Sequence, residues 1–211
     1  IVKFYTLTLD VYSDGEHKLP SFGTVNNNAS NVFENPVWID DVVAENDGIA
    51  DTYGDTDLKP VLGASTIKAY LAGSTYEVGA KTADDNNTNA NMKPGTGYLK
   101  QHSAGVINSQ KVVTVEYFSL NTDHYGGFTG VQINYQGKPY VTATTPSGAN
   151  SNAIAKAFFL KGEKASINAT VATNNTWLNW TGTSTLKTQL AEISMDGKKV
   201  YSAWAQTYAT V

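Results

Sequence analysis

The first twelve residues, IVKFYTLTLDVY, constrain the fold more than any other stretch of the chain. From Tyr5 onward, apolar residues alternate with Thr and Asp, which is the period-2 pattern of a half-buried strand. The apolar face consists of Tyr5, Leu7, Leu9 and Val11. Because such a strand must pair with a sheet, it is either the first strand of its own domain or completes the sheet of a neighbouring copy.

Three features favour exchange of this strand between copies. The chain begins with Ile rather than Met, which predicts either that a leader has been removed or that the sequence was shortened. A turn-forming passage at Ser13, Asp14 and Gly15 could act as a hinge. The alternation also shifts near Lys3, which indicates a bulge or the end of the strand. The predicted donor segment comprises Ile1, Val2, Phe4, Tyr5, Leu7, Leu9 and Val11.

The rest of the chain is typical of an all-β protein. Short segments rich in β-branched and aromatic residues recur between Gly, Asn, Asp and Pro turns, as in residues 111–120, KVVTVEYFSL. No long amphipathic helical pattern or sharp linker interrupts them. The sequence therefore predicts a donor strand at residues 1–12 and a single immunoglobulin-like or jelly-roll β-sandwich at residues 13–211.

Three β-hairpins are expected in the C-terminal half. The first joins residues 131–135 to 140–145 through a Gln-Gly-Lys-Pro turn. The second joins 153–160 to 165–173, where a short helix is the alternative for the first segment. The third joins 186–195 to 199–211 through Asp196 and Gly197, and Asp-Gly is the strongest hairpin signal in the chain.

The composition points to a secreted protein of the cell exterior. The net charge is −4, and all 15 basic residues are lysine, which makes nucleic acid an unlikely partner. There is no cysteine, so disulfides and thiolate metal sites are excluded. No apolar stretch is long enough to cross a bilayer as a helix. The surface is expected to be rich in Thr, Asn, Ser and Gly.

No catalytic motif is present, and the chain is predicted not to be an enzyme. Its 3 histidines, His17, His102 and His124, lie in no metalloprotease motif, and no nucleophile elbow or phosphate-binding loop occurs. Scattered acidic residues could form a glycosidase pair, but any chain with 19 of them has that chance.

Two kinds of modification or ligand remain open, and no cofactor is expected. Calcium is possible in the acidic segment, which is otherwise a solvated loop; the weak candidate ligands are Asp47, Asp51, Asp55 and Asp57. N-linked glycans are expected at N-x-S/T triplets, which begin at Asn28, Asn86, Asn168, Asn174 and Asn179. In the predicted strand at 165–173, Asn168 faces away from Ile167 and Ala169, so its glycan would point to solvent.

Trp177 and Trp180 bracket Asn179 and support an alternative function. If both indoles were exposed, they could stack on sugar rings, and the protein would be a secreted glycan-binding or surface-layer module. The competing interpretation is that at least one of them fills the core, because Trp is usually highly buried.

The organisation of the chain resembles the donor-strand filament subunits of archaea, namely surface threads and bundling pili. It is more distantly similar to the biofilm-matrix fibre proteins of bacilli. The resemblance is carried by the N-terminal IVKFYTLTLDV, the cysteine-free β pattern and the N-x-S/T sites. It implies a glycosylated sandwich that polymerises head-to-tail by strand exchange and serves adhesion or biofilm formation. Burial of Leu7 and Leu9 in the core of their own molecule, with no adjoining copy contributing, would end the filament hypothesis and leave a self-contained secreted sandwich.

Overall fold

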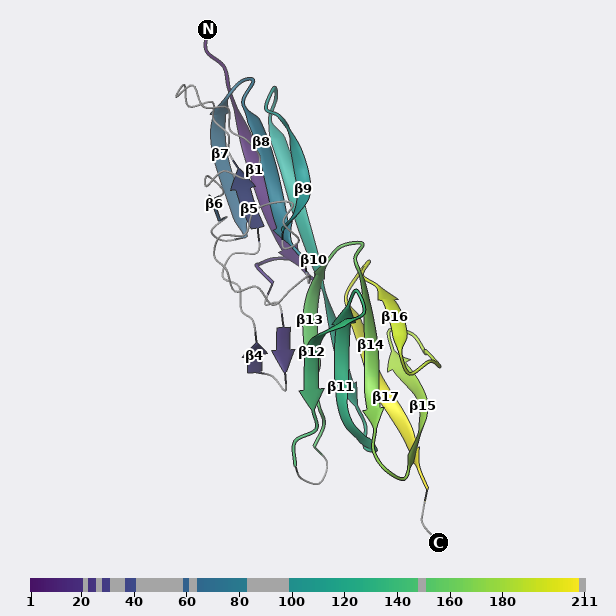
Figure 1. Cartoon of the computed structure of the whole chain (residues 1–211). Helices are drawn as coiled ribbons and strands as arrows, with labels where there is room; N and C mark the ends of the chain where they lie inside the picture. The colour runs from purple at the N-terminus through teal and green to yellow at the C-terminus, as the bar shows by residue number, and fades with distance from the viewer. Residues whose placement is uncertain are drawn as a thin grey trace. The chain divides into compact units, whose positions relative to one another are not determined.

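The computed structural model contains β-strands and no helix in the part of the chain that it describes (Figure 1). It describes residues 1–20, 64–82, 99–147 and 151–208, together with the backbone of short strands at 23–25, 28–30, 37–40 and 59–60. The prediction of an all-β protein is confirmed. Residues 153–160, for which a helix was the alternative, contain strand β13 (Ala155–Leu160).

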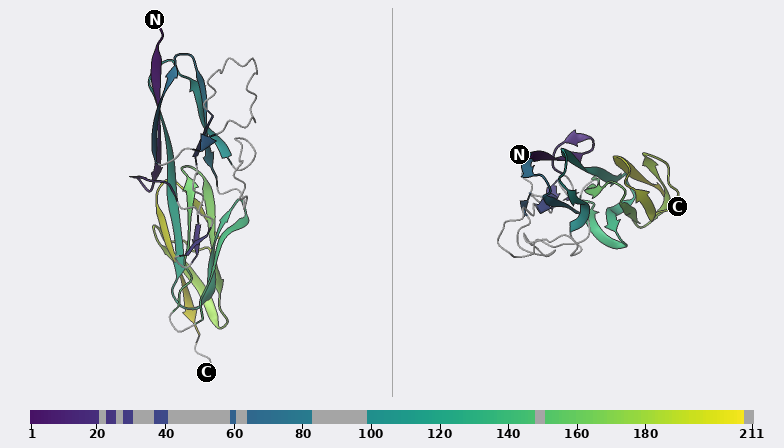
Figure 2. Two further views of the ribbon diagram at one scale, coloured as in Figure 1. Left: turned by 90° about the vertical axis from the view of Figure 1, so that its left-hand side faces the viewer. Right: turned by 90° about the horizontal axis from the view of Figure 1, so that it is seen from above.

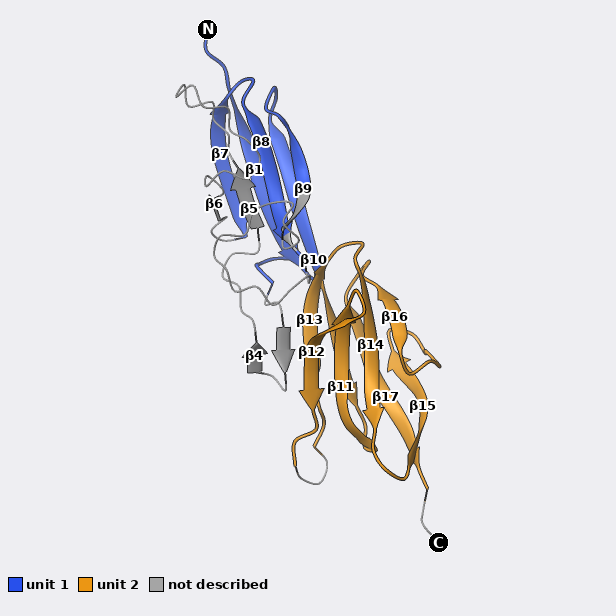
Figure 3. Ribbon diagram, in the orientation of Figure 1, with its two compact units in different colours: residues 1–20, 34–117 blue, residues 21–33, 118–211 orange. Residues whose placement is uncertain are grey.

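The chain forms two compact units rather than the single sandwich expected for residues 13–211 (Figure 3). Unit 1 comprises residues 1–20 and 34–117, and unit 2 comprises residues 21–33 and 118–211. The boundary after residue 117 falls inside one strand, β10 (Lys111–His124). A boundary within a strand has no loop composition, and for this reason the sequence contains no linker signal there.

Unit 1 is built around strand β1 (Phe4–Ser13). β1 pairs in parallel with the first half of β10 and antiparallel with β7 (Ser65–Leu71), and β1 and β10 run side by side in Figures 1 and 2. A second sheet has the order β6-β5-β8-β9. The remaining strands of unit 1 are β2 (Glu16–His17), β5 (Val37–Asp40), β6 (Lys59–Pro60), β8 (Thr75–Lys81) and β9 (Leu99–Val106).

Unit 2 is a sandwich of two sheets. One has the order β15-β17-β10-β13-β3-β4, and the other has the order β12-β11-β14-β16. Aromatic side chains join the two layers: the ring of Phe159 on β13 lies 5.8 Å from that of Tyr140 on β12. The other strands are β3 (Gly23–Val25), β4 (Asn28–Ser30), β11 (Phe128–Tyr135), β12 (Lys138–Thr144), β14 (Lys164–Val171), β15 (Asn175–Gly182), β16 (Ala191–Ser194) and β17 (Lys199–Thr207).

Only the first of the three predicted hairpins pairs as expected. β11 and β12 pair antiparallel around Gln136 and Gly137, whose positive φ angles of 49° and 75° match a type I′ turn. The other two predictions are wrong, because β13 and β14, and likewise β16 and β17, lie in different sheets. A Gly-containing turn stops a strand equally well when the chain crosses between layers, so the turn residues alone do not specify the partner.

His124 is a buried histidine of unit 2, with 1% of its surface exposed. Its Nε2 atom accepts a hydrogen bond of 2.9 Å from the Ala153 amide and lies 2.8 Å from Thr145 Oγ1. The proton of the neutral ring therefore sits on Nδ1, which has no hydrogen-bond partner. Burial lowers the pKa of His124 below its ordinary value of 6.5, and the folded chain holds the ring neutral.

This arrangement predicts that unit 2 loses stability in mild acid. The unfolded chain binds a proton at a higher pH than the folded chain does, so the contribution is complete above pH 6.5 and decreases below it. We expect the urea midpoint of unit 2 to fall between pH 7.5 and pH 5.5, and His124→Gln to reduce that fall. Parallel pH profiles for the two proteins would contradict the prediction.

Candidate functional site

The first candidate site is the slot that β1 fills in unit 1. The register pairs Leu9 with Val113 of β10 on one side and with Thr66 of β7 on the other. Leu7, Leu9 and Val11 are 2%, 1% and 0% exposed, and they pack into the core of their own unit. In the isolated chain the segment is thus the first strand of its own sheet, which is the alternative that counts against strand exchange. The structure holds one copy of the chain, and exchange between copies stays a proposal.

The N-terminal end of the predicted donor segment is exposed, whereas its centre is buried. The strand begins at Phe4. The shift in alternation near Lys3 therefore marks the end of the strand rather than a bulge. Ile1, Val2 and Phe4 are exposed, and Tyr5 is half-buried. The backbone is still held here, since the Ala72 amide donates a hydrogen bond of 2.9 Å to the Lys3 carbonyl.

The passage proposed as a hinge is a tight turn. Asp14 and Gly15 have φ angles of 53° and 82°, as a type I′ turn between β1 and β2 requires. Ser13 is fully buried and donates a 2.8 Å hydrogen bond to the Lys18 carbonyl. The Asp14 amide donates to the Tyr117 carbonyl at 2.9 Å. The expectation of a flexible hinge at residues 13–15 is therefore wrong, and β1 and β2 form one hairpin.

Trp177 and Trp180 do not form an exposed platform. Trp180 is 0% exposed and Trp177 is half-buried, with their rings in edge contact at 5.4 Å. Their indole N–H groups donate to backbone carbonyls of the segment before β16, at Lys187 and Gln189. The hypothesis that this pair stacks on sugars is wrong, because the residues 186–189 close over them.

The exposed aromatic pair of unit 2 is instead Tyr125 and Trp204. Their rings stack at 4.2 Å with an interplanar angle of 25°, and the residues are 50% and 39% exposed. The Trp204 indole donates a 2.7 Å hydrogen bond to Thr181 Oγ1, which fixes the ring. Sequence reasoning missed this pair because Tyr125 and Trp204 are distant in the chain and only the parallel pairing of β10 with β17 brings them together.

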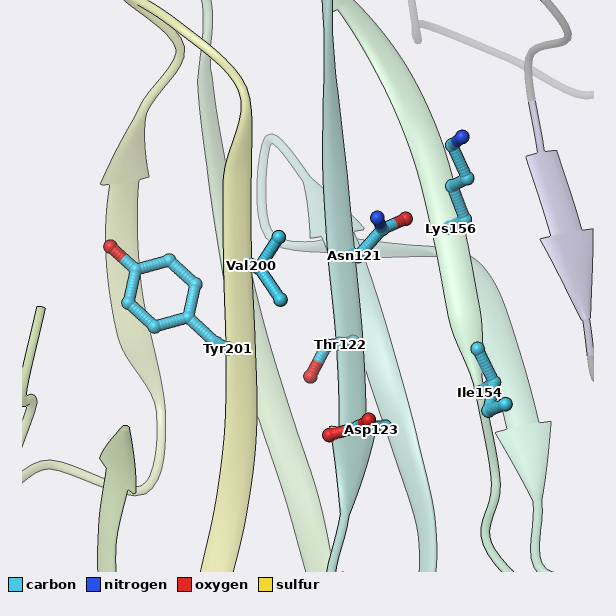
Figure 4. A pocket seen from close by; sticks show the side chains of 7 residues that line it. All are labelled: Asn121, Thr122, Asp123, Ile154, Lys156, Val200 and Tyr201. Carbon is cyan, nitrogen blue, oxygen red and sulfur yellow. The ribbon is translucent and has the colours of Figure 1, made fainter. Parts of the chain in front are cut away.

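The register of β10 against β17 places a hollow next to this pair. Figure 4 shows the residues that line the hollow. It has a volume of about 330 Å³ and is lined by Asn121, Thr122 and Asp123 of β10, by Val200 and Tyr201 of β17, and by Ile154 and Lys156 at β13. Asn121 Oδ1 and Asp123 Oδ1 are buried oxygen atoms without a hydrogen-bond partner. Buried acceptors of this kind normally have a partner, so they mark a place where a ligand donor would be stabilised.

The predicted glycosylation sites are partly within the described residues. Asn168 is half-buried on β14 between buried Ile167 and Ala169, which places it on the outward face. Asn174 is exposed and has a positive φ of 61° in the turn before β15. Asn179 is half-buried on β15 opposite Trp204. The side chain of Asn28 and all of Asn86 lie outside the described residues. Glycosylation stays a prediction.

The candidates for metal binding and catalysis gather at no described site. Asp47, Asp51, Asp55 and Asp57 lie outside the described residues, so the calcium prediction stays open. Within the described ranges, His, Asp and Glu form no group of three or more that could hold a metal ion. His102 contacts the Thr114 carbonyl at 2.7 Å, and the His17 ring lies 4.2 Å from the Tyr12 ring at an angle of 40°. These contacts give both histidines a structural role that needs no ligand or substrate.

Comparisons with known proteins identify no family. No protein-family model matches the chain, and no curated protein matches it. Two solved structures align along nearly its whole length, and both are major pilins of Streptococcus pyogenes. One, a mutant of the major pilin, has a TM-score of 0.33 at 9% identity and covers 97% of this chain and 98% of its own. The other, the T-13 pilin, has a TM-score of 0.30 at 10% identity, with coverages of 95% and 96%.

The described residues include no helix that is long and apolar enough to span a membrane.

Proposed function

We propose that the protein is a non-enzymatic structural subunit of an extracellular filament, and that copies assemble head-to-tail by exchanging β1. In this proposal the isolated chain is the closed form, in which β1 fills its own slot. In the filament, β1 of one copy fills the same slot, between β7 and β10, of the next copy. Exchange of an identical element reuses the contacts that β1 makes in the closed form, and a head-to-tail contact that does not close produces a filament.

The observation that carries the proposal is the division of the donor segment into a buried and an exposed part. Leu7, Leu9 and Val11 fit a core, whereas Ile1, Val2 and Phe4 are 118%, 70% and 63% exposed. Phe4 pairs with Leu71, which is 49% exposed, so the apolar surface continues onto β7. Exposed apolar surface of this kind commonly marks a contact between proteins. A neighbouring copy in the filament would cover it.

Because residues 13–15 form a tight turn, the exchanging element is the β1–β2 hairpin, residues 1–17. The chain after this hairpin, from Lys18, would carry the change of direction between the closed and the exchanged form. Surface location, adhesion, biofilm formation and N-linked glycans belong to the same proposal, and the partner is another copy of the chain.

Engineered disulfides test the exchange directly. Thr6 and Ala69 are Cα partners on β1 and β7. Antiparallel partners lie about 4.5–5.5 Å apart, within the range that a disulfide bridges. The chain has 0 cysteines, so Thr6→Cys with Ala69→Cys introduces the only thiols. After assembly and oxidation, we expect a ladder of covalent multimers on a non-reducing denaturing gel, because each disulfide would join two copies.

A pair within the β11–β12 hairpin is the matched control. Gln132 and Thr142 are also antiparallel Cα partners, and the Gln132 amide donates to Thr142 Oγ1 at 3.0 Å. Gln132→Cys with Thr142→Cys should give monomers only, because this hairpin stays in its own chain. If assembled filaments of both cysteine variants give only monomers on the gel, exchange of β1 is ruled out. If electron micrographs show no filaments, the filament itself is ruled out.

A further inference from the structure

On the outward face of the β15-β17-β10 sheet, cross-strand partners on β10 and β17 form rows across the two strands. In the parallel pairing of β10 with β17, Asn121 lies opposite Val200 and Asp123 opposite Ser202. The next outward row is the stacked pair Tyr125 and Trp204. Successive rows are two residues apart, so the three rows extend over about 13 Å. This surface combines one aromatic platform with one polar hollow.

We propose that this surface binds a neutral oligosaccharide. The exposed aromatic rings offer an electron-rich face to the C–H groups of a sugar ring. The hollow beside them, about 330 Å³, is at the lower end of the size range of ligand sites. The platform and the hollow together are long enough for an oligosaccharide rather than one sugar.

The polar atoms of the hollow select the chemistry of the ligand. Asn121 Oδ1 and Asp123 Oδ1 are buried acceptors that have no donor. Both side chains line the hollow, and rotation about the terminal bond of either one would turn its covered oxygen toward a sugar hydroxyl. Each hydrogen bond formed in this way would give a donor to an oxygen that has none. Asp123 and Lys156 give the lining one charge of each sign, so the hollow has no net charge and favours an uncharged sugar chain. Lys156 lines the far side of the hollow, and its ammonium group lies 5.0 Å from the centre of the Phe158 ring.

The same face contains a predicted glycosylation site. Asn179 on β15 is the cross-strand partner of Trp204, and Thr181 of its triplet accepts the Trp204 indole hydrogen bond. A glycan on Asn179 would cover the platform and exclude an external sugar. The binding experiment therefore needs the full-length chain made in a host that attaches no N-linked glycans.

Titration with maltoheptaose, cellohexaose and chitohexaose tests the proposal, with a heparin hexasaccharide as the anionic probe. We expect at least one neutral probe to bind with a millimolar or tighter Kd in calorimetry, and the heparin probe not to bind. Trp204→Ala and Asn121→Ala should each weaken that binding about tenfold or more, which corresponds to about 1.4 kcal/mol. Leu190→Ala removes a similarly exposed apolar side chain outside the rows and should leave binding unchanged.

The same measurements can overturn the proposal. Failure of all three neutral probes to bind the glycan-free chain would refute it, as would binding of the heparin probe alone. Equal affinity of Trp204→Ala and the unmodified chain would show that sugars bind elsewhere. Circular dichroism of each variant separates loss of the site from loss of the fold. The outcome is independent of strand exchange, because every residue of the surface lies in unit 2.

Discussion

A chain that lacks residues 1–17 is expected to lose the ordered sheets of unit 1, and a synthetic peptide of residues 1–17 is expected to restore them. Leu7, Leu9 and Val11 are almost completely buried. Burial of three such side chains contributes about 5–9 kcal/mol, which is comparable to the whole stability of a small domain. Truncation also leaves one backbone edge of β7 and one of β10 without the partner they have in the complete chain.

Hydrogen exchange is the appropriate measurement, because it reports the two units separately. Amides of β7 and of residues 111–117 should lose protection on truncation and regain it when the peptide is added, while those of β11 and β14 keep theirs. A peptide with Leu9→Asp should not restore the protection of these amides, since it would place a carboxylate in the core. A peptide with Thr8→Asp should still restore their protection, because Thr8 faces outward beside Asp10. Full protection of unit 1 in the truncated chain would show that β1 is dispensable.

The second large effect is expected at Trp180. Its replacement by Ala should lower the free energy of unfolding of unit 2 by about 3–5 kcal/mol, the usual cost of removing a buried aromatic ring. The side chain is 0% exposed, and its indole N–H satisfies the Gln189 carbonyl at 3.0 Å. Loss of the ring would leave a cavity and an unpaired carbonyl.

Trp204→Ala provides the comparison for Trp180→Ala. Trp204 is 39% exposed, so its loss should cost about 1 kcal/mol or less. Urea denaturation followed by circular dichroism gives both values, since other tryptophans complicate fluorescence. A larger cost at Trp204 than at Trp180 would mean that the assignment of core and surface in β15 and β17 is reversed.

The sequence predicted elements better than it predicted their partners. Alternation in residues 5–11 was sufficient to place Leu7, Leu9 and Val11 on one buried face, because the period of side chains along a strand is a local property. The signal at Asp196 and Gly197 correctly ended a strand. It did not predict that β17 pairs with β10 and β15, because pairing in a sandwich depends on which layer the chain enters next.

The division into two units had a faint local signal. Along β10 the buried residues are Val113, Val115 and Tyr117, but beyond Ser119 they are Leu120, Thr122 and His124. The buried face therefore changes parity at Ser119 and Leu120, directly after the unit boundary. The sequence shows apolar residues at 118 and 120 where alternation from 113 would place polar ones. Departures of this kind are common in strands, so they do not predict a boundary by themselves.

The proposed sugar-binding surface was the least predictable part of the molecule. Trp177 and Trp180 are neighbours in sequence and were natural candidates, but their indoles are satisfied by the chain that follows them. The pair Tyr125 and Trp204 becomes visible only with the register of β10 against β17. Neither the unpaired oxygen of Asn121 nor that of Asp123 has a sequence signature, because satisfaction of a buried acceptor is a property of the three-dimensional packing.

The parallel register of β1 against β10 has a mechanical consequence. Residues 7–13 lie beside residues 111–117 with both strands running in the same direction. A force that draws β1 out along its own axis therefore acts on all the bonds of this ladder at once, in shear, rather than peeling them apart one by one. A thread held together by such joints would resist tension far better than its individual hydrogen bonds suggest, and it would need neither a disulfide nor a metal to do so.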